Sequence, residues 1–104
     1  MENAFKVDFK KGVRMDSLHL QGVIDAHADR NLTAAVMQVS APVVHLDFSK
    51  VGRINSMGIA LLLRSLKLMK AEKQAEIQVS GLSQMNSMLF KMTGVFLLAN
   101  EIKN

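Results

Sequence analysis

Residues 47–64 read DFSKVGRINSMGIALLLR, and this stretch carries the clearest fold signal in the chain. The apolar run over residues 43–48 predicts a buried strand, and the residues that follow form a short polar link. From Ser56 onward the apolar residues have helical spacing. A serine at a helix start is either an N-cap or a position where negative charge is added or bound, because helix N-termini present free N–H groups and favour anions.

The helix that is predicted to begin at Ser56 has the strongest helical pattern in the chain. Its apolar stripe consists of Ile59, Leu62, Leu63, Leu66 and Met69. Four further apolar side chains lie off this stripe: Met57, Ala60, Leu61 and Leu68. They are either peripheral packing residues or an adaptable apolar docking patch beside Ser56, since methionine accommodates varied partners.

Upstream, residues 5–9 and 14–22 alternate between apolar and polar types, which predicts two strands joined at the turn around Gly12. Asp25 is placed as an N-cap for a helix that ends before Pro42. An alternative role for Asp25 is a loop position at the same end of the domain as Ser56. Gly22 is expected to end the second strand.

Downstream, residues 76–80 alternate as a short strand, and Ser83 is placed as the cap of a further helix. Gly94 is a helix stop, and residues 95–102 form one more short strand or an extended tail. This order predicts an α/β fold with a mixed sheet of four or five strands and three or four helices. Residues 1–104 are expected to form a single domain.

The composition narrows the possible functions. Of the 104 residues, 49% are hydrophobic and 21% are charged, and the chain has no cysteine, which excludes disulfides and thiolate chemistry. No apolar run is long enough to span a bilayer, so we expect a cytoplasmic protein without a membrane segment. The net charge of +4 is mild, and no pattern of a nucleic-acid reader is present. No cofactor is expected. The histidines lack metal-ligand spacing: His19, His27 and His45.

Catalysis by Ser56 is not supported by its surroundings. The nucleophile-elbow pattern Gly-x-Ser-x-Gly is absent, because residue 54 is Ile54. Nothing in the sequence supplies an oxyanion site, so we expect a protein that is not an enzyme.

Three short motifs, taken in order, resemble those of the STAS domain family, the fold of bacterial anti-sigma factor antagonists. The first is LDFSKVGRINSMGIALLL over residues 46–63, where the family pattern places an acceptor serine at the start of a helix. The second is a glycine followed by an acid, Gly22 and Asp25, and the third is the pair of turns at residues 81–83 and 93–96. The resemblance covers nearly the whole chain and implies the STAS fold.

In that family, the serine that corresponds to Ser56 is phosphorylated by a partner serine kinase of the anti-sigma type, and a PP2C-type phosphatase removes the phosphate. The unphosphorylated form binds its partner. The resemblance thus implies a phosphorylation switch whose output is sigma-factor control or biofilm and exopolysaccharide regulation. Two neighbours depart from the pattern: Asn55 replaces the usual Asp, and Met57 replaces a Ser or Thr.

The residues expected to contact the partner surround Ser56: Asp25, Arg53, Asn55, Met57, Gly58 and Leu61. Arg53 and Lys50 are either solvated loop charges or groups that steer an acidic partner. The alternative function is a ligand-sensing or scaffold module that binds a nucleotide or a small anion, with Ser56 acting only as a helix cap.

Overall fold

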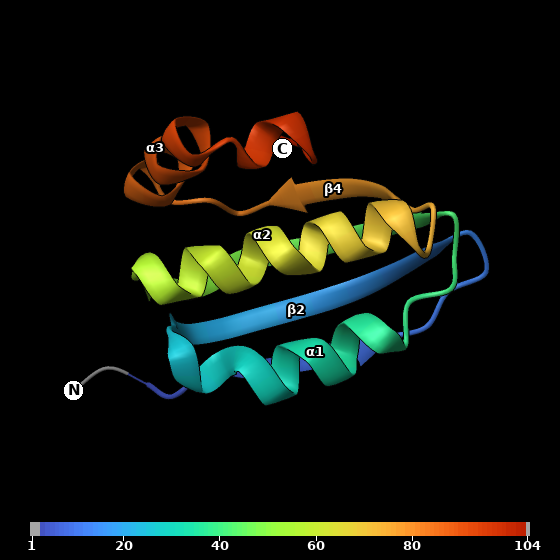
Figure 1. Ribbon diagram of the computed structural model, residues 1–104, viewed down its shortest axis with the longest axis horizontal. Helices are drawn as coiled ribbons and strands as arrows, with labels where there is room; N and C mark the ends of the chain where they lie inside the picture. The colour runs from blue at the N-terminus through green and yellow to red at the C-terminus, as the bar shows by residue number, and fades with distance from the viewer. Residues whose placement is uncertain (1–2, 104) are drawn as a thin grey trace.

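The computed structural model describes residues 3–103, so residues 1, 2 and 104 of the expected domain lie outside it. The strands are β1 Lys6–Lys10, β2 Met15–Ile24, β3 Val43–Ile54, β4 Glu76–Ser80 and β5 Asn100–Glu101. The helices are α1 Asp29–Met37, α2 Ser56–Ala71 and α3 Gln84–Thr93, with short 3-10 helices η1 Ala26–Ala28 and η2 Val95–Leu97. The predicted α/β fold with a mixed sheet is confirmed (Figure 1).

The five strands form one sheet in the order β1-β2-β3-β4-β5. β1 and β2 form an antiparallel hairpin, as the sequence predicted, and every later pairing is parallel. Helices connect the parallel strands, as such crossovers require. The carboxyl ends of β2 and β3 therefore lie at the same end of the sheet as the start of α2 (Figure 1, left).

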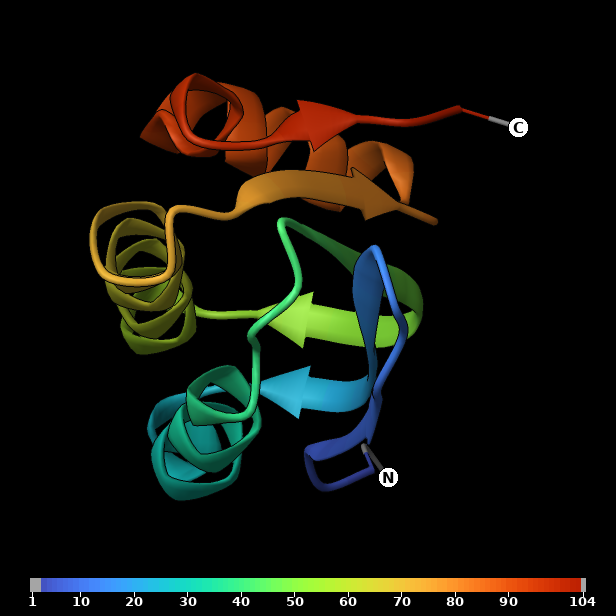
Figure 2. The same ribbon diagram turned by 90° about the vertical axis from the view of Figure 1, so that its right-hand side faces the viewer.

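The sheet has one covered and one open face. Figure 2 shows α1 and α2 on the same side of the strands. Leu18, Leu46 and Ile77 point to that side and are buried. Most alternating positions on the other face carry polar side chains that are half-buried or exposed, among them His19 and Asp47. This is the pattern of a sheet that packs on helices with one face and meets water with the other.

α3 is held by aromatic packing and by one buried amide. The Phe90 ring makes edge-to-face contacts with Phe48 and Phe96, with centroid distances of 5.2 and 6.0 Å. Asn86 is buried, and its Nδ2 donates to the carbonyl oxygen of Gly52 at 2.9 Å. The first turn of α3 is thereby fixed beside the end of β3.

Two predicted boundaries are wrong. The expected polar link before Ser56 is strand, because β3 runs through to Ile54 and pairs Lys50 and Val51 with β2. Register shifts in this ladder interrupt the simple alternation, which hid the strand in the sequence. Gly22 does not end β2 but lies within it at φ +86°, where an added Cβ would collide with the backbone of Ala4.

At the end of the sheet opposite the start of α2, one buried carboxylate connects separate segments of the chain. Asp16 has no exposed surface and accepts the backbone N–H groups of Gly12, Ser40 and Ala41 at 2.8–3.0 Å. The Lys11 ammonium lies 3.5 Å away. Burial alone would raise the pKa of Asp16, but the three N–H donors and the cation outweigh it and lower the pKa to about 2. Asp16 ties the β1–β2 turn to the segment before β3.

Over residues 3–103, no helix combines the length and hydropathy that crossing a bilayer would require. The same residues contain no group of three or more His, Asp or Glu side chains arranged to hold a metal ion.

Candidate functional site

The start of α2 is capped by Asn55 and not by Ser56. Asn55 has extended backbone angles, and its Oδ1 accepts the N–H of Gly58 at 2.8 Å. Ser56 is the first residue inside the helix. The interpretation of Ser56 as the N-cap is therefore wrong by one residue, because both side chains are good caps and only backbone geometry decides between them. Asn55 accepts the hydrogen bond that a capping aspartate would accept, but it adds no negative charge.

Gly58 fixes how closely the helix start approaches the sheet. It is buried, and a Cβ added to it would collide with the carbonyl group of Ile24 at the end of β2. The same carbonyl oxygen accepts the backbone N–H of Asn55 at 3.2 Å. Glycine at this position lets α2 begin directly against β2, which leaves the two residues before it at the surface.

Ser56 and Met57 are exposed at this first turn, and Met57 keeps 54% of its surface accessible. Asn55 and Arg53 are also exposed. A hydroxyl, a thioether and a guanidinium thus lie within five residues at one end of the domain. Because Asn55 supplies the cap, the Ser56 hydroxyl is not required for the helix to begin.

Asp25 lies at the same end and shapes a hollow beside the helix start. Its Oδ1 accepts the N–H of His27 at 2.9 Å and lies 3.4 Å from the His27 Nδ1. Asp25 therefore caps η1, whereas the predicted α1 begins later, at Asp29, without a side-chain cap. A cavity of about 290 Å³ brings Asp25, His27 and Arg53 together with Asn3, Ala4, Phe5 and Val23.

Two of the six expected contact residues point inward. Leu61 is 8% exposed and belongs to the hydrophobic core, and Gly58 is buried against β2. α2 packs against α1 and η1 as well as the sheet, and its buried face, which includes Leu61 and Ser65, is wider than the predicted stripe. The members that present an accessible surface are Asp25, Arg53, Asn55 and Met57.

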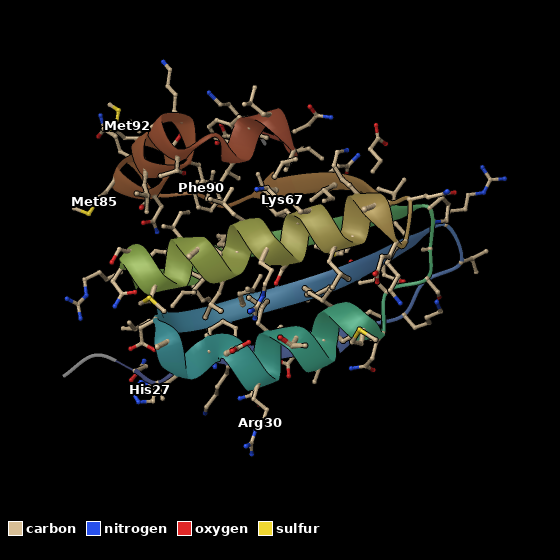
Figure 3. All side chains as sticks on the ribbon, viewed as in Figure 1. His27, Arg30, Lys67, Met85, Phe90 and Met92 are labelled. Atoms are coloured by element: carbon tan, nitrogen blue, oxygen red, sulfur yellow. The ribbon has the colours of Figure 1, made fainter. Side chains whose placement is uncertain are left out.

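Two residues at this end were missed from the sequence. His27 lies at the protein surface near the start of α1 (Figure 3), and its position two residues after the capping Asp25 was the only available signal. Asn86 fastens α3 beside the site through Gly52, and a contact between residues 34 positions apart leaves no local pattern.

The open sheet face contains a separate pair of polar contacts. His19 Nδ1 lies 3.4 Å from Asp47 Oδ2, and His45 Nε2 lies 2.6 Å from Ser80 Oγ. Partial burial would raise the pKa of Asp47, but hydrogen bonds from Ser49 and His19 outweigh it and lower that pKa. These contacts do not involve Ser56 or the exposed residues around it, Asp25, Arg53, Asn55 and Met57.

Comparison with known families gives a match over most of the chain. Residues 7–96 match the family model described as "Mlab, STAS domain". No curated protein sequence matches this chain.

Solved structures share the fold at low sequence identity. An anti-sigma factor antagonist from Mycobacterium paratuberculosis matches with a TM-score of 0.75 and 18% identity, over 94% of this chain and 85% of that one. The anti-sigma factor antagonist SpoIIAA in its unphosphorylated form matches at 0.68 and 17%, over 97% and 89%. The Bacillus cell fate determinant SpoIIAA in its phosphorylated form matches at 0.68 and 16%, over 97% and 91%. The family match and the shared fold together lead to one conclusion: this chain belongs to the STAS domain family.

Proposed function

We propose that this chain is a phosphorylation-switched protein-interaction module and not a catalyst, with Ser56 as the phosphate acceptor. The observation that carries the proposal is that Asn55, and not Ser56, caps the start of α2. Asn55 caps the helix, so the start of the helix does not need the Ser56 hydroxyl. Ser56 is also exposed. A kinase can modify such a hydroxyl without first unfolding the helix.

The similar structures support a switch of this kind. SpoIIAA is described in both a phosphorylated and an unphosphorylated form, and it is an anti-sigma factor antagonist. By analogy, the unphosphorylated chain binds a serine kinase of the anti-sigma type, and a PP2C-type phosphatase resets it. The downstream output is sigma-factor control or biofilm and exopolysaccharide regulation, in a cytoplasmic setting.

The physical effect of the phosphate is local. Phosphorylation adds about −1.5 to −2 charges at pH 7. At the first residue of α2, these charges meet the positive end of the helix dipole, so the folded domain tolerates them. A partner seated on Ser56 and Met57 instead meets a bulky, strongly hydrated group. Release needs only a few kcal/mol, since 1.4 kcal/mol is about tenfold in affinity.

Mass mapping tests the acceptor directly. The protein is incubated with ATP and each anti-sigma-type serine kinase encoded by the same genome, and its peptides are analysed by mass spectrometry. We expect one phosphate, on Ser56, and none on the Ser56→Ala variant. Phosphate on another residue, or no phosphate with any of these kinases, would refute the proposal.

Two substitutions test the direction of the switch. Ser56→Ala is expected to fold normally and to bind the kinase permanently, because no phosphate can be added. Ser56→Asp is expected to weaken binding only partly, since aspartate carries one charge and phosphate nearly two. If Ser56→Asp kept full activity in cells, the assignment of the phosphorylated form as the off state would be wrong.

The hollow beside Asp25 favours a second candidate function, the binding of a nucleotide or small anion. It has a volume of about 290 Å³ and is lined by His27 and Arg53 as well as Asp25. Thermal-shift measurements with ATP, GTP and inorganic phosphate test this function, because a ligand of the folded state raises the melting temperature. Stabilisation that is lost in Arg53→Ala, together with normal cellular output from Ser56→Ala, would favour ligand sensing.

A further inference from the structure

α3 presents a row of methionines to solvent. Met85, Met88 and Met92 are 75%, 56% and 78% exposed, although they follow helical spacing on one side of the helix. Figure 3 shows Met85 and Met92 at the outer side of α3, while Phe90 turns toward the rest of the molecule. We call these three residues the methionine face. It spans about 10 Å, or two helical turns.

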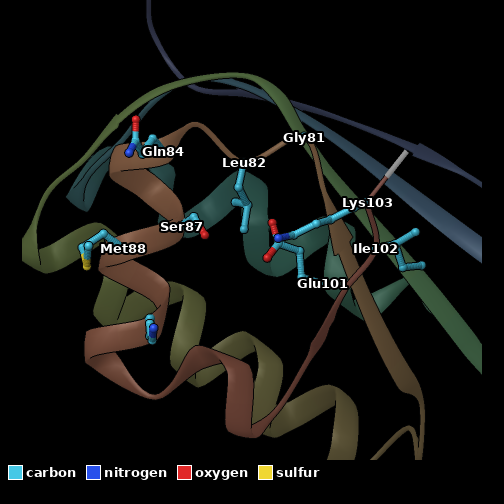
Figure 4. A pocket seen from close by; sticks show the side chains of 9 residues that line it. Gly81, Leu82, Gln84, Ser87, Met88, Glu101, Ile102 and Lys103 are labelled. Atoms are coloured by element: carbon cyan, nitrogen blue, oxygen red, sulfur yellow. The ribbon is translucent and has the colours of Figure 1, made fainter.

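A hollow adjoins the methionine face at Met88. Its volume is about 510 Å³, and it lies between α3 and the C-terminal residues (Figure 4). Leu82, Met88 and Ile102 supply apolar walls, and Lys91 and Glu101 supply charge. A row of flexible thioethers beside a hollow with apolar walls has the form of a helix-binding groove, where one anchor side chain enters the hollow.

Cations outnumber carboxylates around the face. α3 contains no Asp or Glu, and its one charged residue, Lys91, is exposed. Glu101, at the hollow, is the one carboxylate among its lining residues, against the cations Lys91 and Lys103. A partner that carries acidic side chains on both sides of an apolar stripe would meet complementary charge here.

The methionine face also continues toward the Ser56 site. The first turn of α3 is fastened to β3 by Asn86, whose amide donates to Gly52, four residues before Ser56. Met57, at the start of α2, adds a further exposed thioether at that end. A segment laid along α3 can therefore extend toward the surface that phosphorylation of Ser56 would change.

We propose that the methionine face and its adjoining hollow dock an acidic amphipathic helix of a partner protein. The proposal deepens the proposed function by naming the kind of partner segment, and it rests on that function only in assuming a protein partner. No step in it requires phosphate on Ser56, so the unphosphorylated protein is sufficient for the test.

The methionine methyl groups provide the measurement. The protein is labelled with ¹³C at the methionine methyls and titrated with a synthetic 18-residue peptide that has leucines at helical spacing and glutamates elsewhere. We expect the signals of Met85, Met88 and Met92 to shift. Met37 on α1 and the fully buried Met69 are internal controls and should stay in place. A matched peptide with lysine in place of every glutamate should not bind.

Matched variants separate the apolar and charged contributions. Met88→Gln and Met92→Gln should each lower the affinity for the acidic peptide about tenfold, as measured by fluorescence anisotropy. Met37→Gln, which changes a methionine on α1 that is as exposed as Met88 (57% against 56%), should leave binding unchanged. Lys91→Gln should weaken binding and reduce its dependence on salt. Circular dichroism melting confirms that each variant is folded.

Three kinds of result would overturn the proposal. The first is a lack of specificity: the lysine peptide binds as tightly as the glutamate peptide, or the Met37 signal shifts as much as the signals of the methionine face. The second is binding of phosphatidylglycerol vesicles through the methionine face without binding of the acidic peptide, which would assign the face to a membrane. The third is a dimer, detected by sedimentation and abolished by Met88→Gln, which would assign the face to a second copy of the chain. Each leaves the phosphorylation test of Ser56 intact.

Discussion

At the start of β2, Asp16 has no exposed surface and holds three backbone N–H groups, whereas beyond the end of β3 Asn55 holds one N–H from an exposed position. The two ends use the same device, a side-chain oxygen that accepts backbone N–H groups. At the Asp16 end the device is buried and connects distant segments. At the Ser56 end it is exposed and local. The difference teaches that the fold is secured away from the surface proposed to change state.

The largest effect is expected at the buried end. Asp16→Ala should lower the free energy of unfolding by about 3 kcal/mol, because it leaves the buried N–H of Ala41 and the partly buried N–H of Ser40 without an acceptor. Urea denaturation measures the change. Asp8→Ala, which removes an exposed aspartate from β1, is the control and should change the free energy by less than about 0.5 kcal/mol. Equal losses in both variants would contradict the contrast between the ends.

The same carboxylate makes stability depend on pH in acid. The folded pKa of Asp16, about 2, lies below the ordinary value of 3.8, so the unfolded chain takes up the proton first. Its contribution of roughly 2 kcal/mol is complete above about pH 4 and is lost as the pH falls from 4 toward 2. Asp47, whose pKa is also lowered, acts in the same direction. Denaturation midpoints from pH 2 to 6 should fall less steeply for Asp16→Asn than for the natural chain.

A substitution at Gly58 tests whether the close approach of α2 to β2 stabilises the exposed end. Gly58→Ala should lower the free energy of unfolding by up to about 2 kcal/mol, because the new methyl group meets the carbonyl of Ile24. Gly52→Ala is a matched control, since no atom lies within 4 Å of a Cβ added there. Thermal melts of the two variants should therefore separate. If they coincided, the close approach of α2 to β2 would not govern stability.

The smallest effects compare two adjacent residues of the exposed end. Asn55→Ala should cost about 1 kcal/mol, as expected for the loss of an N-cap, and Asn55→Asp should cost little. Ser56→Ala should change stability by less than about 0.5 kcal/mol while abolishing phosphorylation. Urea denaturation of the three variants checks the order. A larger loss in Ser56→Ala than in Asn55→Ala would restore Ser56 as the cap.

The sequence predicted what depends on local periodicity. The hairpin, the amphipathic helix after Ser56 and the strand at residues 76–80 have clear repeats, and each was found. Residues 95–102, predicted as a short strand or an extended tail, contain η2 and the two-residue β5. The second half of β3 was missed because its irregular pairing with β2 breaks the alternation.

The site was predicted less completely because its geometry depends on contacts between distant residues. The position of Ser56 at the start of α2 followed from spacing, but one residue of register decided that Asn55 is the cap. α2 also packs against α1 and η1, and its burial extends to Leu61, beyond the stripe that its own pattern predicted. Asp16 accepts N–H groups from residues as many as 25 positions away, and such contacts leave no local signal.

The order of the strands in the sheet has a consequence for how the chain folds during synthesis. Each strand pairs with the strand that precedes it in the sequence, so no strand has to be inserted between two that are already paired. The hairpin of β1 and β2 can form first, and each later strand can add to a growing edge as it leaves the ribosome. Such stepwise addition avoids the long loop closures that slow folding. The methionine face, carried by α3, can then form only after the first four strands have left the ribosome.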